Sequence, residues 1–288
     1  DGVRAVARRL RLLDGADVLV ENLRPGALSR MGLGYEDLAA SHPELIYASA
    51  SGWGQDGPLA EHPGLDIMAQ ARSGIMSITG FPDAPPAKVG VPICDLTAAL
   101  YLALAIVAAV HERSRSGRGQ HIDVSLLESG VSLAVWEAGK YFATGEINGP
   151  QGSAHQAQAP YQAVRVADGH ATIGANTQAN WARFCRALGR EALMDAPRYL
   201  TPTTRMEHRE SLIAAIEART EQFTAAELVD LVQGAGVPAA PINDFRQVFS
   251  DEHLAARDFF WDAAQPTAGP IRQIGNPQRI QRVSGGGD

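Results

Sequence analysis

The spacing of apolar residues alternates between two periods along the first half of the chain. Continuous short runs of Val, Leu, Ile and Ala at 16–22 and 45–49 are typical of strands buried in a parallel sheet. Helical spacing surrounds the first run, at 3–13, 27–31 and 35–41. This order predicts an α/β fold with a Rossmann-like, parallel open sheet and flanking helices.

The longest apolar stretch runs from 98 to 110, which is too short to span a bilayer. It predicts a buried helix over about 96–113, with Asp95 in the N-cap position because aspartate accepts backbone N–H bonds there. A strand at 120–126 and a second helix at 127–144 are expected to follow.

The second half of the chain has a different pattern. Asp168-Gly169, a turn signal, separates two short β-rich runs and predicts a hairpin. Helical spacing then recurs at 178–188, 207–219 and 225–233. The predicted division is a large α/β domain at 1–145, a Gly- and Pro-rich linker at 146–160, a small α+β domain at 161–236, and a return segment toward the large domain at 237–288.

Composition excludes several classes of protein. The 288 residues are 45% hydrophobic, and the formal net charge of -7 is inconsistent with the basic surface of a nucleic-acid-binding protein. Two cysteines make no disulfide framework and the scattered histidines make no metal-ligating pair, so we expect a cytoplasmic protein without metal or membrane segment. The chain starts without Met or a signal-peptide pattern, and we expect it to be a piece of a longer protein.

Local chemistry alone assigns no catalytic residue. The sequence has no GxGxxG turn after a strand, no Walker A loop, no GxSxG elbow and no HExxH motif. By itself Asp95 is a helix cap, Asn22 a turn former and Arg30 a solvated charge at a helix end.

Four segments, in this order and at these spacings, nevertheless resemble one known family. They are Val18–Gly32 with its Glu-Asn-Leu-Arg-Pro-Gly motif, Gly64–Gln70, the Asp95 helix with Gly117-Arg-Gly-Gln at its end, and Ala159–Val164. Together they are similar to the CaiB/BaiF family, the class III CoA-transferases. The resemblance runs from about Arg4 to Arg282 and implies an interlocked homodimer, whose full-length subunits extend beyond this sequence at both ends.

The resemblance also implies roles for residues. The catalytic carboxylate falls on Asp95, with coenzyme A as cosubstrate in the form of acyl-CoA, and a small carboxylate as the second substrate. Positions that bind CoA fall on Asn22, Leu23, Arg24, Arg30, Met31, His62 and Asp66. Pro63 stands where some of these transferases have a lysine.

The implied reaction passes through an aspartyl anhydride and an aspartyl-CoA thioester on Asp95, with oxyanion donors expected from the start of the helix. Two alternatives remain open. One is the proton exchange of 2-methylacyl-CoA racemases from the same family, although Leu65 stands in place of their His base and Thr177 near the place of their Glu. The other is a catalytically silent chain.

Overall fold

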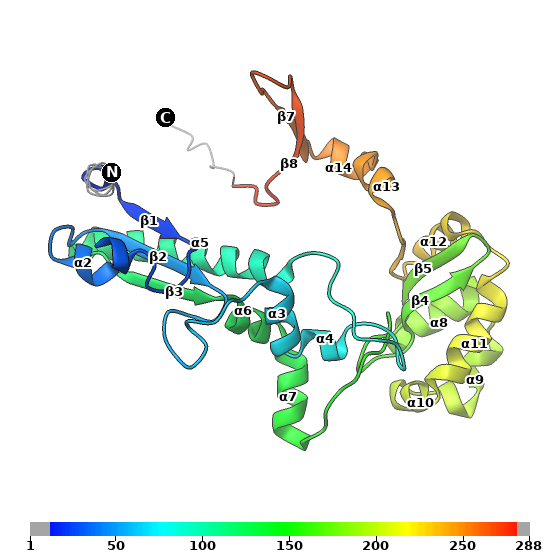
Figure 1. Ribbon diagram of the computed structural model, residues 1–288. Coiled ribbons are helices and arrows are strands. Elements are labelled where there is room, and N and C mark those ends of the chain that lie inside the picture. The colour runs from blue at the N-terminus through cyan, green and yellow to red at the C-terminus, as the bar shows by residue number, and fades with distance from the viewer. Residues whose placement is uncertain (1–11, 281–288) are drawn as a thin grey trace, which may run out of the picture. The chain divides into compact units, whose positions relative to one another are not determined.

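The computed structural model describes residues 12–280, and the chain forms two compact units, 1–152 and 153–288. The first unit contains a three-stranded sheet, and the second contains another three-stranded sheet and a two-stranded hairpin (Figure 1). Buried apolar side chains form two clusters in the first unit and one in the second. The helix predicted at 3–13 lies mostly outside the described residues.

The first unit is built on three parallel strands in the order β1-β2-β3, as the sequence predicts for an α/β fold. Their bounds are Val18–Glu21 for β1, Ile46–Ser51 for β2 and His121–Ser125 for β3. The turn helix η1 (Ser29–Met31) and α2 (Tyr35–Ala39) connect β1 to β2. Because the strands are parallel, their carboxyl ends lie at one edge of the sheet, where open α/β sheets bind ligands.

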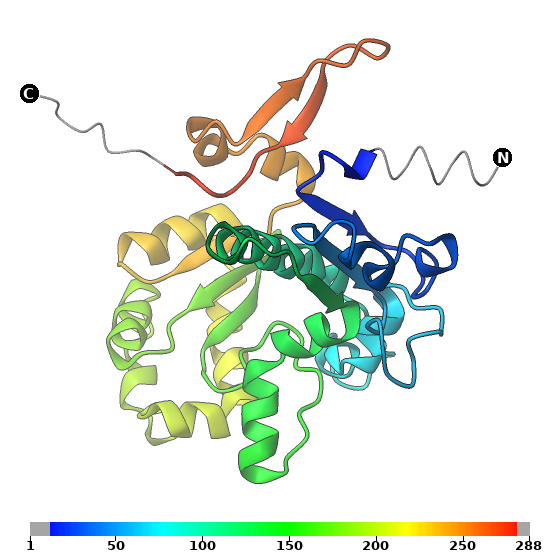
Figure 2. The same ribbon diagram turned by 90° about the vertical axis from the view of Figure 1, so that its left-hand side faces the viewer.

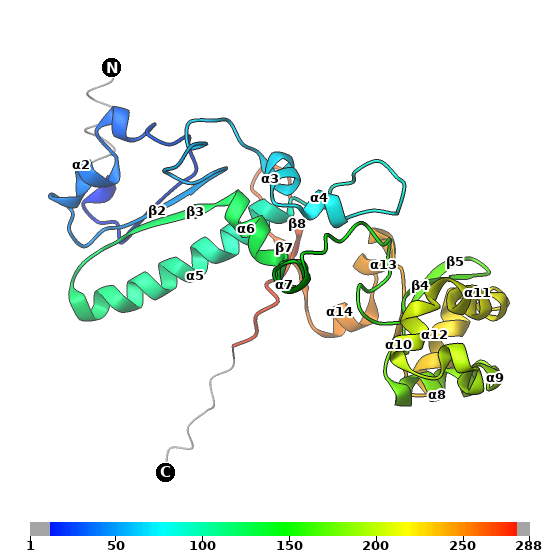
Figure 3. The ribbon, with the colours of Figure 1, turned by 90° about the horizontal axis from the view of Figure 1, so that it is seen from below.

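Helices follow the second strand and surround this edge. The loop after β2 leads into α3 (Asp66–Arg72) and α4 (Ile75–Ile78), and the long helix α5 (Ile93–Ser116) runs along β2 and β3 (Figure 3). The single helix predicted at 127–144 is instead two, α6 (Leu126–Leu133) and α7 (Val135–Thr144). They are separated at Ala134, whose φ of -85° and ψ of 41° lie outside the helical region, so apolar spacing continues where the backbone does not.

Only one side of α5 is buried. Cys94, Ala98 and Leu102 pack inward, whereas Leu100, Leu104 and Val107 are 70%, 67% and 67% exposed in the described chain. The expectation of a buried helix is therefore wrong for the outer face. By length and composition α5 meets the criterion for a membrane-spanning helix, which core helices of soluble proteins also meet, and 28% of its apolar window is buried.

The second unit has an antiparallel sheet covered by helices. Strands β4 (Tyr161–Val166) and β5 (Gly169–Gly174) form the hairpin that the sequence predicts, and β6 (Ala239–Pro241) pairs with β5. β6 belongs to the stretch expected as a return segment, so part of that stretch completes this sheet. The helices are α8 (Gln178–Ala187), α9 (Ala192–Asp195), η2 (Pro197–Tyr199), α10 (Pro202–Glu207), α11 (Arg209–Thr220) and α12 (Ala225–Gly234).

Short elements end the described chain. They are α13 (Phe245–Phe249), α14 (Glu252–Ala256) and a second antiparallel hairpin of β7 (Phe260–Ala263) and β8 (Ile271–Ile274), drawn in orange to red in Figure 2. All of these elements lie in the stretch at 237–288 that the sequence analysis treats as a return segment.

A buried arginine holds the second unit together. Arg205 is 0% exposed, and its guanidinium donates to the carbonyl oxygens of Ala159 (3.1 Å), Tyr199 (3.1 Å) and Asn176 (3.2 Å). The charge also lies over the ring of Trp181, 5.3 Å from its centroid. One side chain thus satisfies polar groups from three segments that would otherwise be buried without partners.

We expect Arg205→Ala to lower the free energy of unfolding of this unit by about 3 kcal/mol, because it leaves several buried carbonyl groups unpaired. Native-state hydrogen exchange of the α8 and β5 amides measures this unit alone. Arg165→Ala is the control, since its guanidinium is exposed and forms ion pairs with Glu217 and Glu221. Equal loss in both variants would contradict the structural role of Arg205.

Candidate active site

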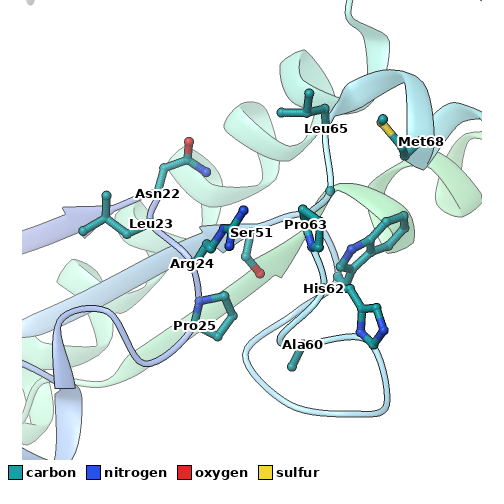
Figure 4. A pocket seen from close by; sticks show the side chains of 13 residues that line it. Asn22, Leu23, Arg24, Pro25, Ser51, Ala60, His62, Pro63, Leu65 and Met68 are labelled. Carbon is teal, nitrogen blue, oxygen red and sulfur yellow. The ribbon is translucent and has the colours of Figure 1, made fainter. Parts of the chain in front are cut away.

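Two cavities lie at the carboxyl edge of the parallel sheet. The first, of about 420 Å³, is formed by the turn after β1 and the loop after β2. Figure 4 shows Asn22, Leu23 and Arg24 on that turn, with His62 and Pro63 on the loop. The full lining is Asn22, Leu23, Arg24, Pro25, Ser51, Gly52, Trp53, Ala60, His62, Pro63, Gly64, Leu65 and Met68.

The second cavity, of about 830 Å³, lies beside the first and extends to α5. Asp95, Asp66, Glu21 and Lys88 are the charged residues of its lining. Asn22, Gly52, Gly64 and Leu65 line both cavities, so the two spaces adjoin along one wall.

Two glycines, Gly52 and Gly64, form part of that shared wall. A Cβ atom on Gly52 would lie 2.9 Å from the Cα of Gly64, and a Cβ on Gly64 would lie 2.7 Å from the Trp53 ring. Contacts this short do not occur between such atoms, so the approach of the two loop segments requires glycine at both positions.

Asp95 is the third residue of α5 and lies in its first turn. The N-cap position belongs to Pro92, which has no capping side chain, so the prediction of Asp95 as the cap is wrong. The cap comes from another element. At the start of α3, Oδ1 of Asp66 accepts the backbone N–H groups of Cys94 (2.9 Å) and Asp95 (3.3 Å).

A buried glutamine holds Asp66 in place. Nε2 of Gln70, a residue that is 0% exposed, donates to Oδ2 of Asp66 at 2.6 Å. Oε1 of the same amide accepts the backbone N–H of Val89 at 2.9 Å, and its Nε2 reaches the carbonyl oxygen of Val91 at 3.5 Å. Gln70 therefore ties α3 to the loop that precedes α5.

These contacts occupy the backbone donors at the start of α5. Besides the two N–H groups held by Asp66, that of Ile93 donates to Val91 (2.8 Å) and that of Leu96 to Pro92 (3.0 Å). The expectation that the first turn of the helix offers free donors to an oxyanion is therefore wrong for this structure.

The other residues expected to contact CoA are distributed unevenly. Asn22, Leu23, Arg24 and His62 line the first cavity, and Nδ2 of Asn22 donates to the carbonyl oxygen of Ala50 at 2.8 Å. Asp66 lines the second.

Arg30 and Met31 line neither cavity. Met31 packs against the apolar cluster that contains Leu33 and Tyr47.

Sequence reasoning did not find Gln70 or Lys88. Gln70 lies four residues after Asp66, a spacing that brings two side chains together on a helix, so this partner was detectable. No local sequence pattern indicates Lys88, because only the folded chain brings it to the cavity that Asp95 lines. Within residues 12–280, no group of three or more His, Cys, Asp or Glu side chains is arranged to hold a metal ion.

Comparison with known proteins gives the family. The profile of "CoA-transferase family III" matches residues 3–286. The chain belongs to CoA-transferase family III. Its relatives include a mouse succinyl-CoA:glutarate CoA-transferase, 36% identical over 98% of this chain and 64% of that protein. Acetyl-CoA:oxalate CoA-transferase of Acetobacter aceti is 36% identical over 97% of this chain and 70% of its own length.

Two solved structures have a similar fold. A CaiB/BaiF family protein from Brucella suis superposes with a TM-score of 0.84 at 37% identity, over 96% of this chain and 71% of that one. Rv3272 from Mycobacterium tuberculosis gives 0.86 at 28% identity, over 96% and 74%. The chain thus spans roughly two thirds of the length of the relatives it matches, 64% in the mouse protein.

The electrostatics of the candidate site in this family III chain centre on two neighbouring carboxylates. Burial and the negative charge of Asp66 both raise the pKa of Asp95 above its ordinary value, burial being the larger cause. Burial, Asp66 and Asp95 raise the pKa of the Cys94 thiol to about 11, so this thiol is protonated and unreactive at neutral pH.

We expect Asp66→Asn to lower the pKa of Asp95, because asparagine keeps an oxygen for the two N–H groups and removes the charge. Burial remains, so the pKa stays above its ordinary value. A ¹³C NMR titration of the aspartate carboxyl groups measures the change. Asp17→Asn is the control, since Asp17 pairs with Arg113 (2.7 Å) at the far end of α5, and an unchanged Asp95 titration in Asp66→Asn would refute the coupling.

Proposed function

We propose that this chain transfers coenzyme A from an acyl-CoA donor to a carboxylate acceptor, with Asp95 as the nucleophile. One observation carries the proposal. The carboxylate on which the family resemblance places the chemistry lines a cavity that shares a wall with the cavity of Asn22, Arg24 and His62, the expected CoA contacts. A thioester entering along the first cavity would present its carbonyl group to the second.

The reaction is a sequence of acyl exchanges. The Asp95 carboxylate attacks the thioester carbon, the C–S bond breaks, and CoA thiolate leaves behind a mixed anhydride. The thiolate then attacks the aspartyl carbonyl, which frees the donor acid and forms aspartyl-CoA. The acceptor carboxylate reverses these steps and leaves as its CoA ester, with Asp95 regenerated as a carboxylate.

The residues around Asp95 support this role by fixing its backbone. Asp95 has to be ionised at each turnover, because the carboxylate and not the neutral acid attacks the thioester carbon. A pKa raised by burial and Asp66 makes the carboxylate more basic and a stronger nucleophile while it remains ionised. Stabilisation of the tetrahedral oxyanion falls to groups other than the first-turn amides of α5, which are engaged.

We propose a dicarboxylic acid as one of the substrates. The relatives are named for transfer between succinyl-CoA and glutarate, mesaconate or citramalate, or between acetyl-CoA and oxalate, and each of these four acids, like succinic acid, has two carboxyl groups. A transferase is favoured over a racemase because Leu65, which cannot act as a base, lines both cavities at the position of the racemase histidine.

We expect Asp95→Asn to reduce transfer at least about 1,000-fold, since the amide is a poor nucleophile. Mass spectrometry after hydroxylamine trapping should find the adduct on Asp95 of the unmodified chain and no adduct in the variant. Asp17→Asn should retain activity. Exchange of the α-proton in D2O without acid exchange would instead indicate a racemase, and transfer at the normal rate by Asp95→Asn would exclude Asp95 as nucleophile.

We further propose that the protein is a cytoplasmic homodimer. The outer stripe of α5, Leu96, Leu100, Leu104 and Val107, is 49–70% exposed and has the spacing of a helix-packing face. A second copy of the chain would remove this apolar area from water.

We expect Leu104→Glu to shift the protein from dimer to monomer, because it buries a charge in that interface. Sedimentation equilibrium measures the change. Leu200→Glu, at a residue that is 51% exposed in the second unit, should leave the dimer intact. A Leu104→Glu variant that remains dimeric would place the interface elsewhere.

A further inference from the structure

We propose that Lys88 binds the carboxylate at the far end of a dicarboxylate acyl group and thereby favours diacids over monoacids. This inference rests on the proposed function and adds to it a residue that the family resemblance does not assign. The subsite lies in the second cavity, which Lys88 and Asp95 line together.

The charges of this cavity require a cation for such a substrate. Among the described residues of its lining, Glu21, Asp66 and Asp95 are acidic and Lys88 is the one base. The monothioester of a diacid still carries one free carboxylate. Without Lys88 that group would meet three carboxylates of its own sign in a partly desolvated space, whereas a monoacid ester carries no such charge.

Gln70 positions the backbone beside Lys88 and, through Asp66, the backbone of Asp95. The buried Gln70 accepts the N–H of Val89, the residue after Lys88, and donates to Asp66. Asp66 in turn accepts the N–H of Asp95. One amide thus fixes the backbone at the base of the lysine and the carboxylate that caps the nucleophile, so the two functional groups are positioned by the same element.

The ammonium group itself has only weak partners in this structure. Nζ of Lys88 donates to the carbonyl oxygens of Val89 (3.0 Å) and Gly90 (3.4 Å), which belong to its own loop, and the side chain is exposed. The ion pairs recorded between described residues do not include it. A substrate carboxylate would replace neutral acceptors by a charged one, which makes a stronger hydrogen bond.

Lysine is rare in this chain. Lys88 and Lys140 are the only lysines in the sequence, and all other members of its 25 Lys and Arg residues are arginine. Lysine has a compact charge on a flexible four-carbon stem, whereas the arginine fork demands a fixed planar partner. A mobile point charge suits the free end of acyl chains that differ in length.

Kinetics on paired donors test the proposal. Succinyl-CoA and butyryl-CoA have acyl chains of equal length and differ in the terminal carboxylate. We expect Lys88→Met to lower kcat/KM roughly 10- to 100-fold for succinyl-CoA, mainly through KM, and to leave butyryl-CoA within about twofold. Lys88→Arg should restore part of the loss, and Lys140→Met, in a residue paired with Glu146 (2.8 Å), should match the unmodified chain.

Two results would overturn the proposal. Equal loss with both donors would mean that Lys88 contacts CoA or supports the loop, and no loss with either would mean that it contacts no substrate.

A second measurement does not require turnover. The two lysines can be acetylated with a lysine-selective reagent and quantified by peptide mass spectrometry. Glutarate should protect Lys88 relative to Lys140, and butyrate should not. If glutarate does not protect Lys88 from acetylation in a chain that carries out transfer, only the inference about Lys88 is contradicted. If glutarate protects Lys88 in a chain that forms no Asp95 adduct, the diacid subsite is supported and the proposed reaction is contradicted.

Discussion

The carboxylate of Asp66 is the contact on which the geometry of this site depends. α5 begins after Pro92, which offers no capping side chain, so the N–H groups of its first turn need an acceptor from elsewhere. Asp66 supplies one across 28 and 29 residues of sequence. Because the capped turn also carries Asp95, the start of α3 determines where the carboxylate of Asp95 lies relative to the loop after β2.

This single contact has opposing consequences for chemistry. It occupies the backbone donors that would otherwise make the helix N-terminus a site for anions, and it places a negative charge near Asp95, the proposed nucleophile. The first effect moves oxyanion stabilisation to other groups. The second favours a protonated Asp95, yet it strengthens the carboxylate as a nucleophile at any pH where Asp95 is ionised. The site therefore gains a fixed, basic carboxylate, while the first-turn N–H groups of α5 are already engaged and do not bind an anion.

Much of the fold was predictable from apolar spacing, because its elements are local. β1, β2, β3 and the β4–β5 hairpin follow the predicted runs closely. The predictions are wrong where contacts between residues far apart in the sequence determine the structure. The apolar spacing predicted that the long helix starts after Asp95, the last charged residue before the apolar run. Instead Asp66 satisfies the N–H groups of Cys94 and Asp95, and the helix starts at Ile93. Leu100 and Leu104 belong to the apolar run, but the run alone does not predict which surface, if any, packs against them.

The site was predictable only in part, and the reason is the same. Local pattern gave Asp95 no more than a capping role, and the family resemblance supplied its chemistry. Asn22, Leu23, Arg24 and His62 meet at one cavity because the turn after β1 and the loop after β2 emerge from neighbouring parallel strands. Arg30 and Met31 come later on the same connection, where the chain has already turned into η1 and its apolar cluster.

Two glycines lie where the two adjoining cavities share their lining. Gly52 follows the last residue of β2 and Gly64 precedes α3, and the two backbone segments approach closely at these residues. A side chain at either position would push the loop after β2 away from α3, and Asp66 lies two residues beyond Gly64. The close packing of these two glycines thus also bears on the position of Asp66, and through Asp66 on that of Asp95.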